Sequence, residues 1–148
     1  MHLFRHAVIS LTIAAGCALF TPAMAAAAQS AAAPCGASAS ACISLSSHRA
    51  WLMSGGQVTY GPTAITSGRP GQRTPPGVFH VLWKDKNHRS SEFNNAPMPY
   101  SVFFTSSGIA FHEGSLSRAS AGCVHLSHTA ATTFFNQLSV GQVVQVVS

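Results

Sequence analysis

A cysteine and three histidines lie close together in the last third of the chain. His112 is followed by Cys123 after a short segment rich in serine, and His125 and His128 come directly behind the cysteine. A thiol attacks as its thiolate, and an ordinary cysteine pKa of about 8.5 leaves only a few per cent ionised at neutral pH. A neighbouring imidazole that accepts the proton removes this limit. The spacing therefore predicts that His112 and Cys123 form a base and nucleophile pair.

A turn of small residues, Ser120–Gly122, precedes the cysteine. Gly122 allows a sharp bend, after which backbone amides near Cys123 could point at a developing oxyanion, and each such donor contributes about 3 to 4 kcal/mol in acyl-transfer sites. The imidazole also needs a partner that fixes its tautomer. The Glu113 side chain is a poor candidate, because adjacent side chains on a strand point to opposite faces. We therefore expect a backbone carbonyl near His112 in this role, and a site suited to acyl transfer.

Two other interpretations of these residues stay open. Cys123 could be buried and inert, since a free cysteine packs like a small hydrophobic residue. Thiolate and imidazole also suit zinc, although the spacing matches no standard zinc finger; the candidate ligands would be His112, Cys123, His125 and His128. We expect no metal and no organic cofactor. The order of the residues, His before Cys, argues against a papain-like peptidase.

The start of the chain has the features of a secretory signal. A short basic beginning that includes Arg5 is followed by an apolar run, Ala7–Phe20, and by the small-x-small sequence Ala23–Ala25. The apolar run is shorter than the roughly 20 residues that span a bilayer. We therefore expect residues 1–25 to be cleaved and the protein to reach the periplasm, the cell wall or the exterior without stable membrane insertion. Processing as a lipoprotein at Cys17 is the alternative.

Residues 26–41 are mostly Ala, Ser, Gln and Pro and show no periodicity, which is typical of a flexible tether. The folded domain is then expected over residues 42–148. Cys35 and Cys42 are close enough in sequence to close a small disulfide loop in an oxidising compartment, and the sequence leaves open whether they do. Cys123 would remain without a partner.

The composition indicates one folded domain. The chain has 148 residues, of which 47% are hydrophobic and 7% charged, so it can fill a core and is not a charge-rich disordered segment. The formal charge is +5. The basic residues form no run that could follow a phosphate backbone, so we expect no nucleic-acid partner.

The pattern of elements predicts a mainly β domain, a sandwich or barrel-like sheet with one or two short helices. The turn Ser54–Gly56 divides a hairpin, and Ser127 or Thr129 could cap a helix over Ala130–Leu138. We expect Trp51 and Trp83 in the core. The expected strands are Ile43–Leu45, Ala50–Tyr60 in two runs, Val78–Trp83, Ser101–Thr105, Ile109–His112 and Val143–Val147.

The residues around the cysteine resemble the active-site signature of the YkuD-type L,D-transpeptidases, in which a His element precedes Ser-x-Gly-Cys and a hydrophobic residue. The matching residues are His112 and the segment Ser120–Val124. Thr66–Gly68, Thr74–Phe79 and Met98–Tyr100 resemble further elements of the family. The likeness extends over roughly residues 43–148 and implies a YkuD-like mixed β fold.

The resemblance implies a role for each matching residue. Cys123 would be the nucleophile that attacks a peptidoglycan stem peptide between its diamino acid and its terminal D-Ala, and His112 would be the base and then the acid. The backbone carbonyl of Glu113 would orient the imidazole. Tyr100 would line the donor cleft, and His125 would contact substrate. Ser120 and Gly122 would shape the oxyanion site.

The implied function is that of an exported cysteine L,D-transpeptidase, with stem peptides as partners and carbapenems as inhibitors. An L,D-carboxypeptidase and a catalytically silent peptidoglycan-binding module are the alternatives. Ala121, Glu113 and His125 replace residues that are commonly His, Gly and Arg or Asn in the family, and the segment between His112 and Cys123 is short. Five basic residues are expected to be a solvated face or, if functional, to contact carboxylates of stem peptides or anionic wall polymers: Arg69, Arg73, Lys84, Lys86 and Arg89.

Overall fold

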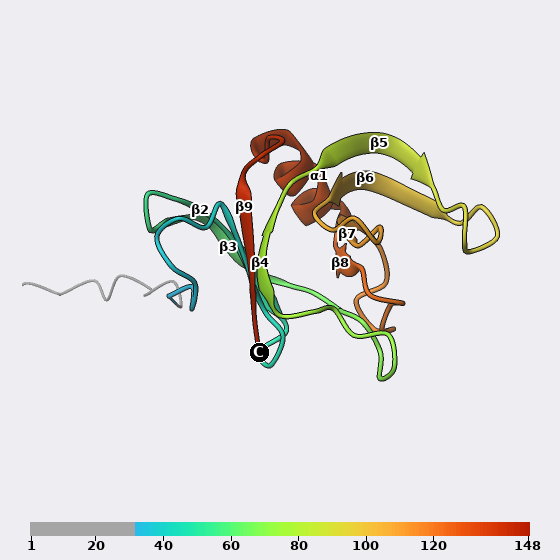
Figure 1. Cartoon of the computed structure of the whole chain (residues 1–148), viewed down its shortest axis with the longest axis horizontal. Helices are drawn as coiled ribbons and strands as arrows, with labels where there is room; N and C mark the ends of the chain where they lie inside the picture. Colours follow the sequence, from blue (N-terminus) through green and yellow to red (C-terminus); the bar gives the residue numbers. More distant parts are fainter. Residues whose placement is uncertain (1–31) are drawn as a thin grey trace, which may run out of the picture.

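The structure is a computed structural model that describes residues 32–148, so the expected signal segment and most of the expected tether lie outside the described residues. The described chain folds into nine strands and one helix (Figure 1). In chain order these are β1 Ala41–Ser44, β2 Arg49–Ser54, β3 Gln57–Ala64, β4 Gly77–His80, β5 Trp83–Arg89, β6 Pro97–Phe103, β7 Ala110–Glu113, β8 Val124–Leu126, α1 His128–Gln137 and β9 Val143–Val147.

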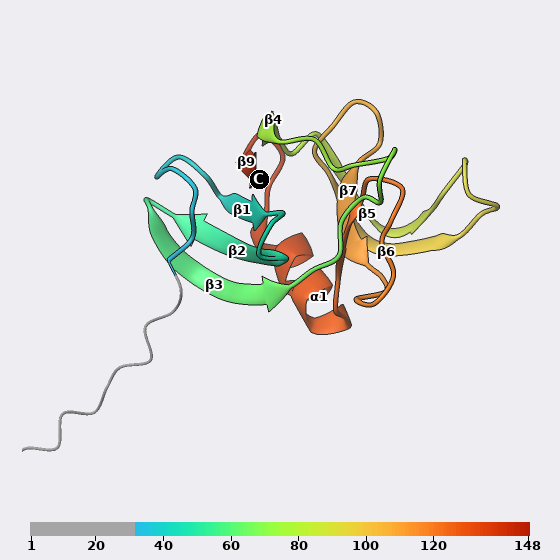
Figure 2. The same ribbon diagram turned by 90° about the horizontal axis from the view of Figure 1, so that it is seen from below.

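The strands form two mixed sheets that face each other across the core (Figure 2). The first has the order β3-β2-β1-β9-β4 and is antiparallel except where β1 runs parallel to β9. The second has the order β5-β6-β7-β8 and is antiparallel except where β7 runs parallel to β8. The expected mainly β class with one short helix is therefore confirmed.

Helix α1 connects the two sheets through its apolar side. Ser127 caps the helix, because its hydroxyl accepts a hydrogen bond from the Ala130 amide at 3.2 Å. Phe134 is fully buried, and its ring lies 5.0 Å from the ring of Phe111 on β7 and 6.1 Å from the ring of Tyr60 on β3. Burial of apolar surface from both sheets against one helix makes a single continuous core.

Two strands, β5 and β8, were not predicted from the sequence. Strand β5 extends over Trp83–Arg89, where the sequence is polar and charged, because β6 supplies the pairing along its whole length. Strand β8 has three residues and is held between β7 and Thr66. Strand β5 lacks the alternating apolar pattern from which strands are predicted, and β8, in which Val124 and Leu126 alternate with His125, is too short to show that pattern.

The N-terminal boundary of the folded part lies earlier than expected. Ala41 is already in β1, Ala39 is buried, and Cys35 is joined to Cys42 by a disulfide. The Gly36 amide donates to the Gln145 side chain at 2.8 Å. The last residues of the expected tether therefore pack against the first sheet.

In the described residues, no helix is long and apolar enough to cross a membrane.

We expect Phe134→Ala to lower the free energy of unfolding by about 3 to 5 kcal/mol, because it leaves a cavity between the two sheets. Urea unfolding followed by fluorescence measures the change. Phe93→Ala is the matched control, since Phe93 is 49% exposed on the hairpin between β5 and β6. Equal losses in the two variants would contradict the central position of α1 in the core.

Candidate functional site

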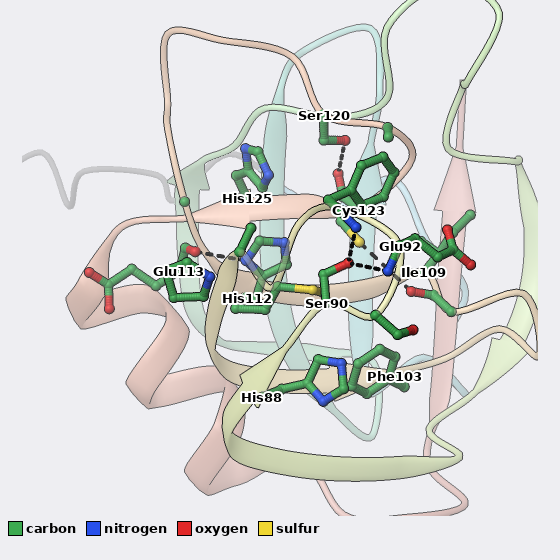
Figure 3. A pocket seen from close by; sticks show the side chains of 18 of the residues that line it. His88, Ser90, Glu92, Phe103, Ile109, His112, Glu113, Ser120, Cys123 and His125 are labelled. Carbon is green, nitrogen blue, oxygen red and sulfur yellow. Dashed lines mark hydrogen bonds between the residues drawn. The ribbon is translucent and has the colours of Figure 1, made fainter.

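A cavity of about 630 Å³ opens on the face of the second sheet that is turned away from α1 (Figure 3). The hairpin between β5 and β6 forms one wall, and the turn before β8 forms another. Three imidazoles line this cavity, those of His88, His112 and His125, together with the thiol of Cys123. Cys123 is the free cysteine of residues 32–148.

The parallel pairing of β7 with β8 brings the reactive residues together. His112 lies directly opposite His125, and their rings are 4.8 Å apart in an edge-to-face arrangement. Cys123 comes two residues before His125, and side chains two apart along an extended chain share a face. The thiol and the His112 imidazole are therefore diagonal neighbours that face the same cavity.

His112 is buried and electrically neutral at physiological pH. Its exposed fraction is 7%, and its Nδ1 lies 2.7 Å from the backbone oxygen of Glu113, to which it donates when it carries the proton. Burial, which disfavours the charged imidazolium, lowers the pKa of His112 to about 4, with smaller contributions from His125 and His88. The Glu113 carbonyl thus orients the ring and leaves Nε2 as the nitrogen able to accept a proton.

The Cys123 thiol is also neutral at rest. Burial raises its pKa, the Ala110 backbone amide acts in the opposite direction, and the charge of Glu92 raises it further. The thiol donates to the backbone oxygen of Gly108 at 3.8 Å, and within residues 32–148 it is not hydrogen-bonded to His112. The site is therefore a neutral thiol beside a neutral imidazole, and proton transfer would have to accompany attack.

The turn before Cys123 is held by internal hydrogen bonds. The Ser120 hydroxyl donates to the Cys123 backbone oxygen at 2.5 Å and accepts from the Gly122 amide at 3.0 Å. Gly122 has φ 128, a conformation that side chains rarely adopt. The Gly122 amide is thus already bonded to the Ser120 hydroxyl, and it does not face the cavity. It is therefore not available as one of the expected oxyanion donors.

A buried threonine supports the same turn and was not assigned a role from the sequence. Thr74 is 1% exposed, and its hydroxyl donates to the Gly122 backbone oxygen at 2.6 Å and accepts from the Gly68 amide at 3.0 Å. Gly68 also pairs with Ser120. The sequence marks this threonine by the two prolines after it and by the resemblance of Thr74–Phe79 to a family element, but it does not identify the partner, which lies 48 residues away.

His125 is fixed by a second set of contacts. Its Nδ1 lies 3.1 Å from both the Thr66 hydroxyl and the Ser115 backbone oxygen. Burial lowers its pKa. A side chain at Gly114 would meet the His125 ring, since an added Cβ would lie 2.6 Å from it. The local backbone therefore leaves room for this imidazole beside His112.

Tyr100 is not part of the cavity, contrary to our expectation. Its ring packs against α1, 5.6 Å from the ring of His128 and 5.8 Å from that of Phe135. Tyr100 has φ 57, and Met98 and Phe103 on either side of it both line the cavity. The backbone irregularity at this position turns the tyrosine towards the helix.

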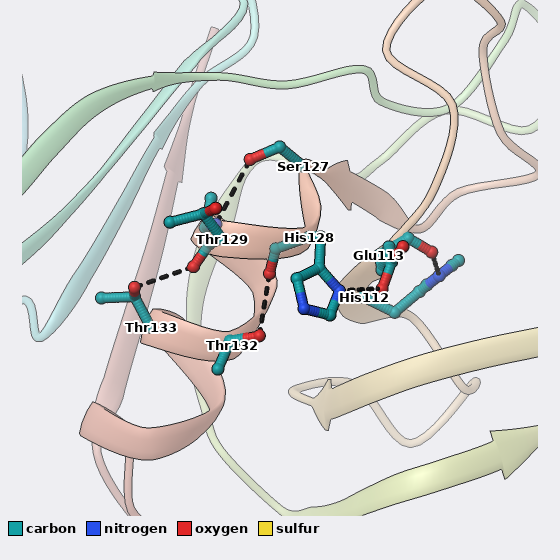
Figure 4. A network of polar contacts seen from close by, with 8 residues as sticks. His112, Glu113, Ser127, His128, Thr129, Thr132 and Thr133 are labelled. Atoms are coloured by element: carbon teal, nitrogen blue, oxygen red, sulfur yellow. Dashed lines mark hydrogen bonds and ion pairs between the residues drawn. The ribbon is translucent and has the colours of Figure 1, made fainter.

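The Glu113 and His128 side chains also point away from the thiol. Glu113 Oε2 lies 2.9 Å from His128 Nδ1 at the start of α1, next to the threonine hydrogen bonds of that helix (Figure 4). His128 therefore does not join His112 and Cys123. In residues 32–148, no group of three or more His, Cys, Asp or Glu side chains is arranged to hold a metal ion.

One aromatic residue expected in the core lies in the cavity instead. Trp83 is 43% exposed and stacks on Phe103 with ring centroids 3.7 Å apart. His88 contacts both rings edge-on and lies 3.2 Å from an oxygen of Asp85. Trp51, by contrast, is 3% exposed, as expected.

Comparison with known proteins agrees with this geometry. Residues 38–146 match the family model of the L,D-transpeptidase catalytic domain, YkuD. The chain belongs to this family. No curated protein matches it closely in sequence.

Several solved L,D-transpeptidases share the fold. The enzyme from Stackebrandtia nassauensis is 26% identical over 73% of this chain and 54% of its own, with a TM-score of 0.69. An L,D-transpeptidase from Mycobacterium tuberculosis H37Rv is 26% identical over 72% of this chain and 56% of its own, with a TM-score of 0.67. The transpeptidase LdtMt1, solved in complex with imipenem, is 28% identical over 70% and 56%, with a TM-score of 0.63. The chain thus spans little more than half the length of these structures.

We expect the protein to lose stability on acidification because of His112. The folded-state pKa of His112, about 4, lies below the ordinary value of 6.5, so the unfolded chain binds a proton between these pH values that the folded chain does not. The free energy of unfolding should fall by about 3 kcal/mol from this group as the pH drops from 7 to 4, with little further loss below.

Urea unfolding at a series of pH values measures this loss in the wild type and in His112→Gln, which cannot titrate. The free energy of unfolding of the wild type minus that of His112→Gln should fall by the same amount, about 3 kcal/mol, as the pH drops from 7 to 4. His80→Gln is the control, since His80 is exposed. A constant difference between wild type and His112→Gln would contradict a buried neutral imidazole.

We expect Thr74→Val to lower the free energy of unfolding by about 2 to 3 kcal/mol, because it leaves the Gly122 oxygen and the Gly68 amide without their partner. The loosened turn should also change the rate at which iodoacetamide alkylates Cys123. Thr74→Ser keeps the hydroxyl and should cost about 1 kcal/mol or less from its lost methyl group. Equal behaviour of the two variants in unfolding and alkylation would show that the hydroxyl is not what holds the turn.

Proposed function

We propose that this domain is an exported L,D-transpeptidase that cross-links peptidoglycan stem peptides through a thioester on Cys123. The observation that carries the proposal is that a free thiol and a buried imidazole with its Nδ1 fixed by a carbonyl line one cavity. Family membership supports the reaction class.

The proposed reaction has two halves. The Cys123 sulfur attacks the carbonyl carbon between the diamino acid and the terminal D-Ala, and Nε2 of His112 accepts the thiol proton. Collapse of the tetrahedral intermediate breaks the peptide bond, and His112 returns the proton to the departing amine of D-Ala. An amine of a second stem then attacks the thioester and gives its proton to His112; the C–S bond breaks, and the departing Cys123 thiolate takes this proton from His112.

The electrostatics of the site favour a proton transfer that is coupled to attack. With a pKa of about 4, His112 is in its basic form at neutral pH. The raised pKa of Cys123 disfavours a resting thiolate and imidazolium pair. The Ala110 amide, which stabilises negative charge on the sulfur, would assist as the thiolate forms.

Water as the acceptor in the second half would make the protein an L,D-carboxypeptidase. A third option is a binding module without turnover. Two departures from the family pattern leave it open, the short segment between His112 and Cys123 and the presence of Ala121. Purified muropeptides separate these possibilities, because a transpeptidase yields cross-linked products and D-Ala, a carboxypeptidase yields tripeptides and D-Ala, and a binding module releases neither.

Imipenem should acylate Cys123, since a solved relative that is 28% identical was obtained with this carbapenem. Intact mass spectrometry should show one adduct on the wild type and none on Cys123→Ala. His112→Ala should slow adduct formation by about 10²- to 10⁴-fold, the usual contribution of a general base. His80→Ala should react like the wild type. No adduct on the wild type, or an adduct that persists in Cys123→Ala, would overturn the proposal.

A further inference from the structure

We propose that Arg69 and Arg118 form a carboxylate-binding subsite on the rim of the Cys123 cavity, and that it holds a carboxylate of the stem peptide whose acyl group is transferred. The inference rests on the proposed function and adds a specificity determinant to it. Both arginines are exposed and both line the same cavity as Cys123.

The backbone of each arginine is tied to the segment that carries the nucleophile. The Arg69 amide donates to the Ser120 backbone oxygen at 3.0 Å, and the Ser120 amide donates to the Ser67 oxygen at 2.9 Å. The Arg118 backbone oxygen accepts from the Thr66 hydroxyl at 3.3 Å. These contacts join the loop after β3 to the loop before β8. The backbone that carries each arginine side chain is therefore held in place at the cavity rim.

Neither guanidinium is neutralised by an acid of the described chain. Within residues 32–148, two acidic side chains contact an imidazole, Asp85 with His88 and Glu113 with His128, and these contacts are ion pairs when the imidazole is protonated. They occupy two of the three acidic residues of the protein. The third, Glu92, lies on the hairpin between β5 and β6, where its charge acts on Cys123.

Three other basic residues of the domain's central region make contacts outside the cavity. Lys84 donates to the Leu138 backbone oxygen at 2.7 Å, and Lys86 lies over the Tyr100 ring at 5.6 Å. Arg89 donates to the Asn95 backbone oxygen at 3.1 Å. Of the five basic residues noted in the sequence, only Arg69 lines the cavity, and Arg118 joins it from another loop.

The chemistry of this pair fits a carboxylate. A guanidinium presents a planar fork of donors that matches the two oxygens of a carboxylate, and it stays charged at any physiological pH. A tetrapeptide stem that places its scissile carbonyl at Cys123 has its terminal carboxylate one residue away, and a second carboxylate on its D-Glu residue when that group is not amidated. Converting the bound carboxylate to an amide removes the charge and keeps the shape.

The test compares three synthetic tetrapeptides: one with both carboxylates free, one amidated at the terminus and one amidated at D-Glu. The double variant Arg69→Gln with Arg118→Gln should raise KM for the free peptide about tenfold or more, as expected for loss of charge-assisted hydrogen bonds. One of the two amidated peptides should lose this difference between variant and wild type, which identifies the carboxylate that is bound. Replacement of both arginines by lysine should restore part of the affinity.

Arg73→Gln is the matched control, because Arg73 is exposed on the same loop as Arg69 and does not line the cavity. An unchanged KM in the double variant would overturn the subsite. An equal loss on all three peptides would overturn it as well, since a structural role would not distinguish acids from amides.

Binding to the Cys123→Ala protein, measured by calorimetry, separates this inference from the proposed function. If the wild type releases no D-Ala but the peptides bind Cys123→Ala with the expected dependence on both arginines, the proposed reaction fails and the subsite stands. If D-Ala is released and binding ignores the arginines, the reaction stands and the subsite fails.

Discussion

The parallel pairing of β7 with β8 is the contact on which the site depends. It sets His112 opposite His125 and brings the turn with Cys123 to the same face of the second sheet. A shift of one residue in this register would move His112 to the helix side, because side chains alternate between faces. The short strand β8 is therefore supported from its other edge, where His125 exchanges two backbone hydrogen bonds with Thr66.

Burial has opposite consequences for the two reactive groups, and both favour neutral forms. It lowers the pKa of His112 and raises that of Cys123, so these two groups do not form a thiolate and imidazolium pair at rest. The hydrogen bond between His112 Nδ1 and the Glu113 carbonyl raises the pKa of His112 and offsets part of the effect of burial. In the proposed mechanism, charge separation between Cys123 and His112 therefore occurs only in the step in which substrate is bound. At that point the substrate excludes water and offers its own polar groups.

The loop between β3 and β4 links the first sheet to this chemistry. Thr66 contacts His125, Thr74 contacts Gly122, and Arg69 is tied to Ser120. One segment thereby supports the second imidazole, the turn of the nucleophile and the proposed carboxylate subsite. The hydroxyl groups of Thr66 and Thr74 donate to the backbone oxygens of Ser115 and Gly122, 49 and 48 residues later in the chain, which ties this loop to the segment before β8.

The sequence by itself determined the class of fold and the cap of α1, and it predicted Cys123 and His112 as the reactive pair, because strand alternation, capping and the ordinary chemistry of a thiol and an imidazole are local properties. The tertiary structure decided what depends on partners distant in the chain. It turned Tyr100 towards α1, exposed Trp83 in the cavity, paired the polar strand β5 with β6, and recruited Thr74 and Arg118 to the site. It also set both pKa directions, since burial is a property of the packed chain and not of any short segment.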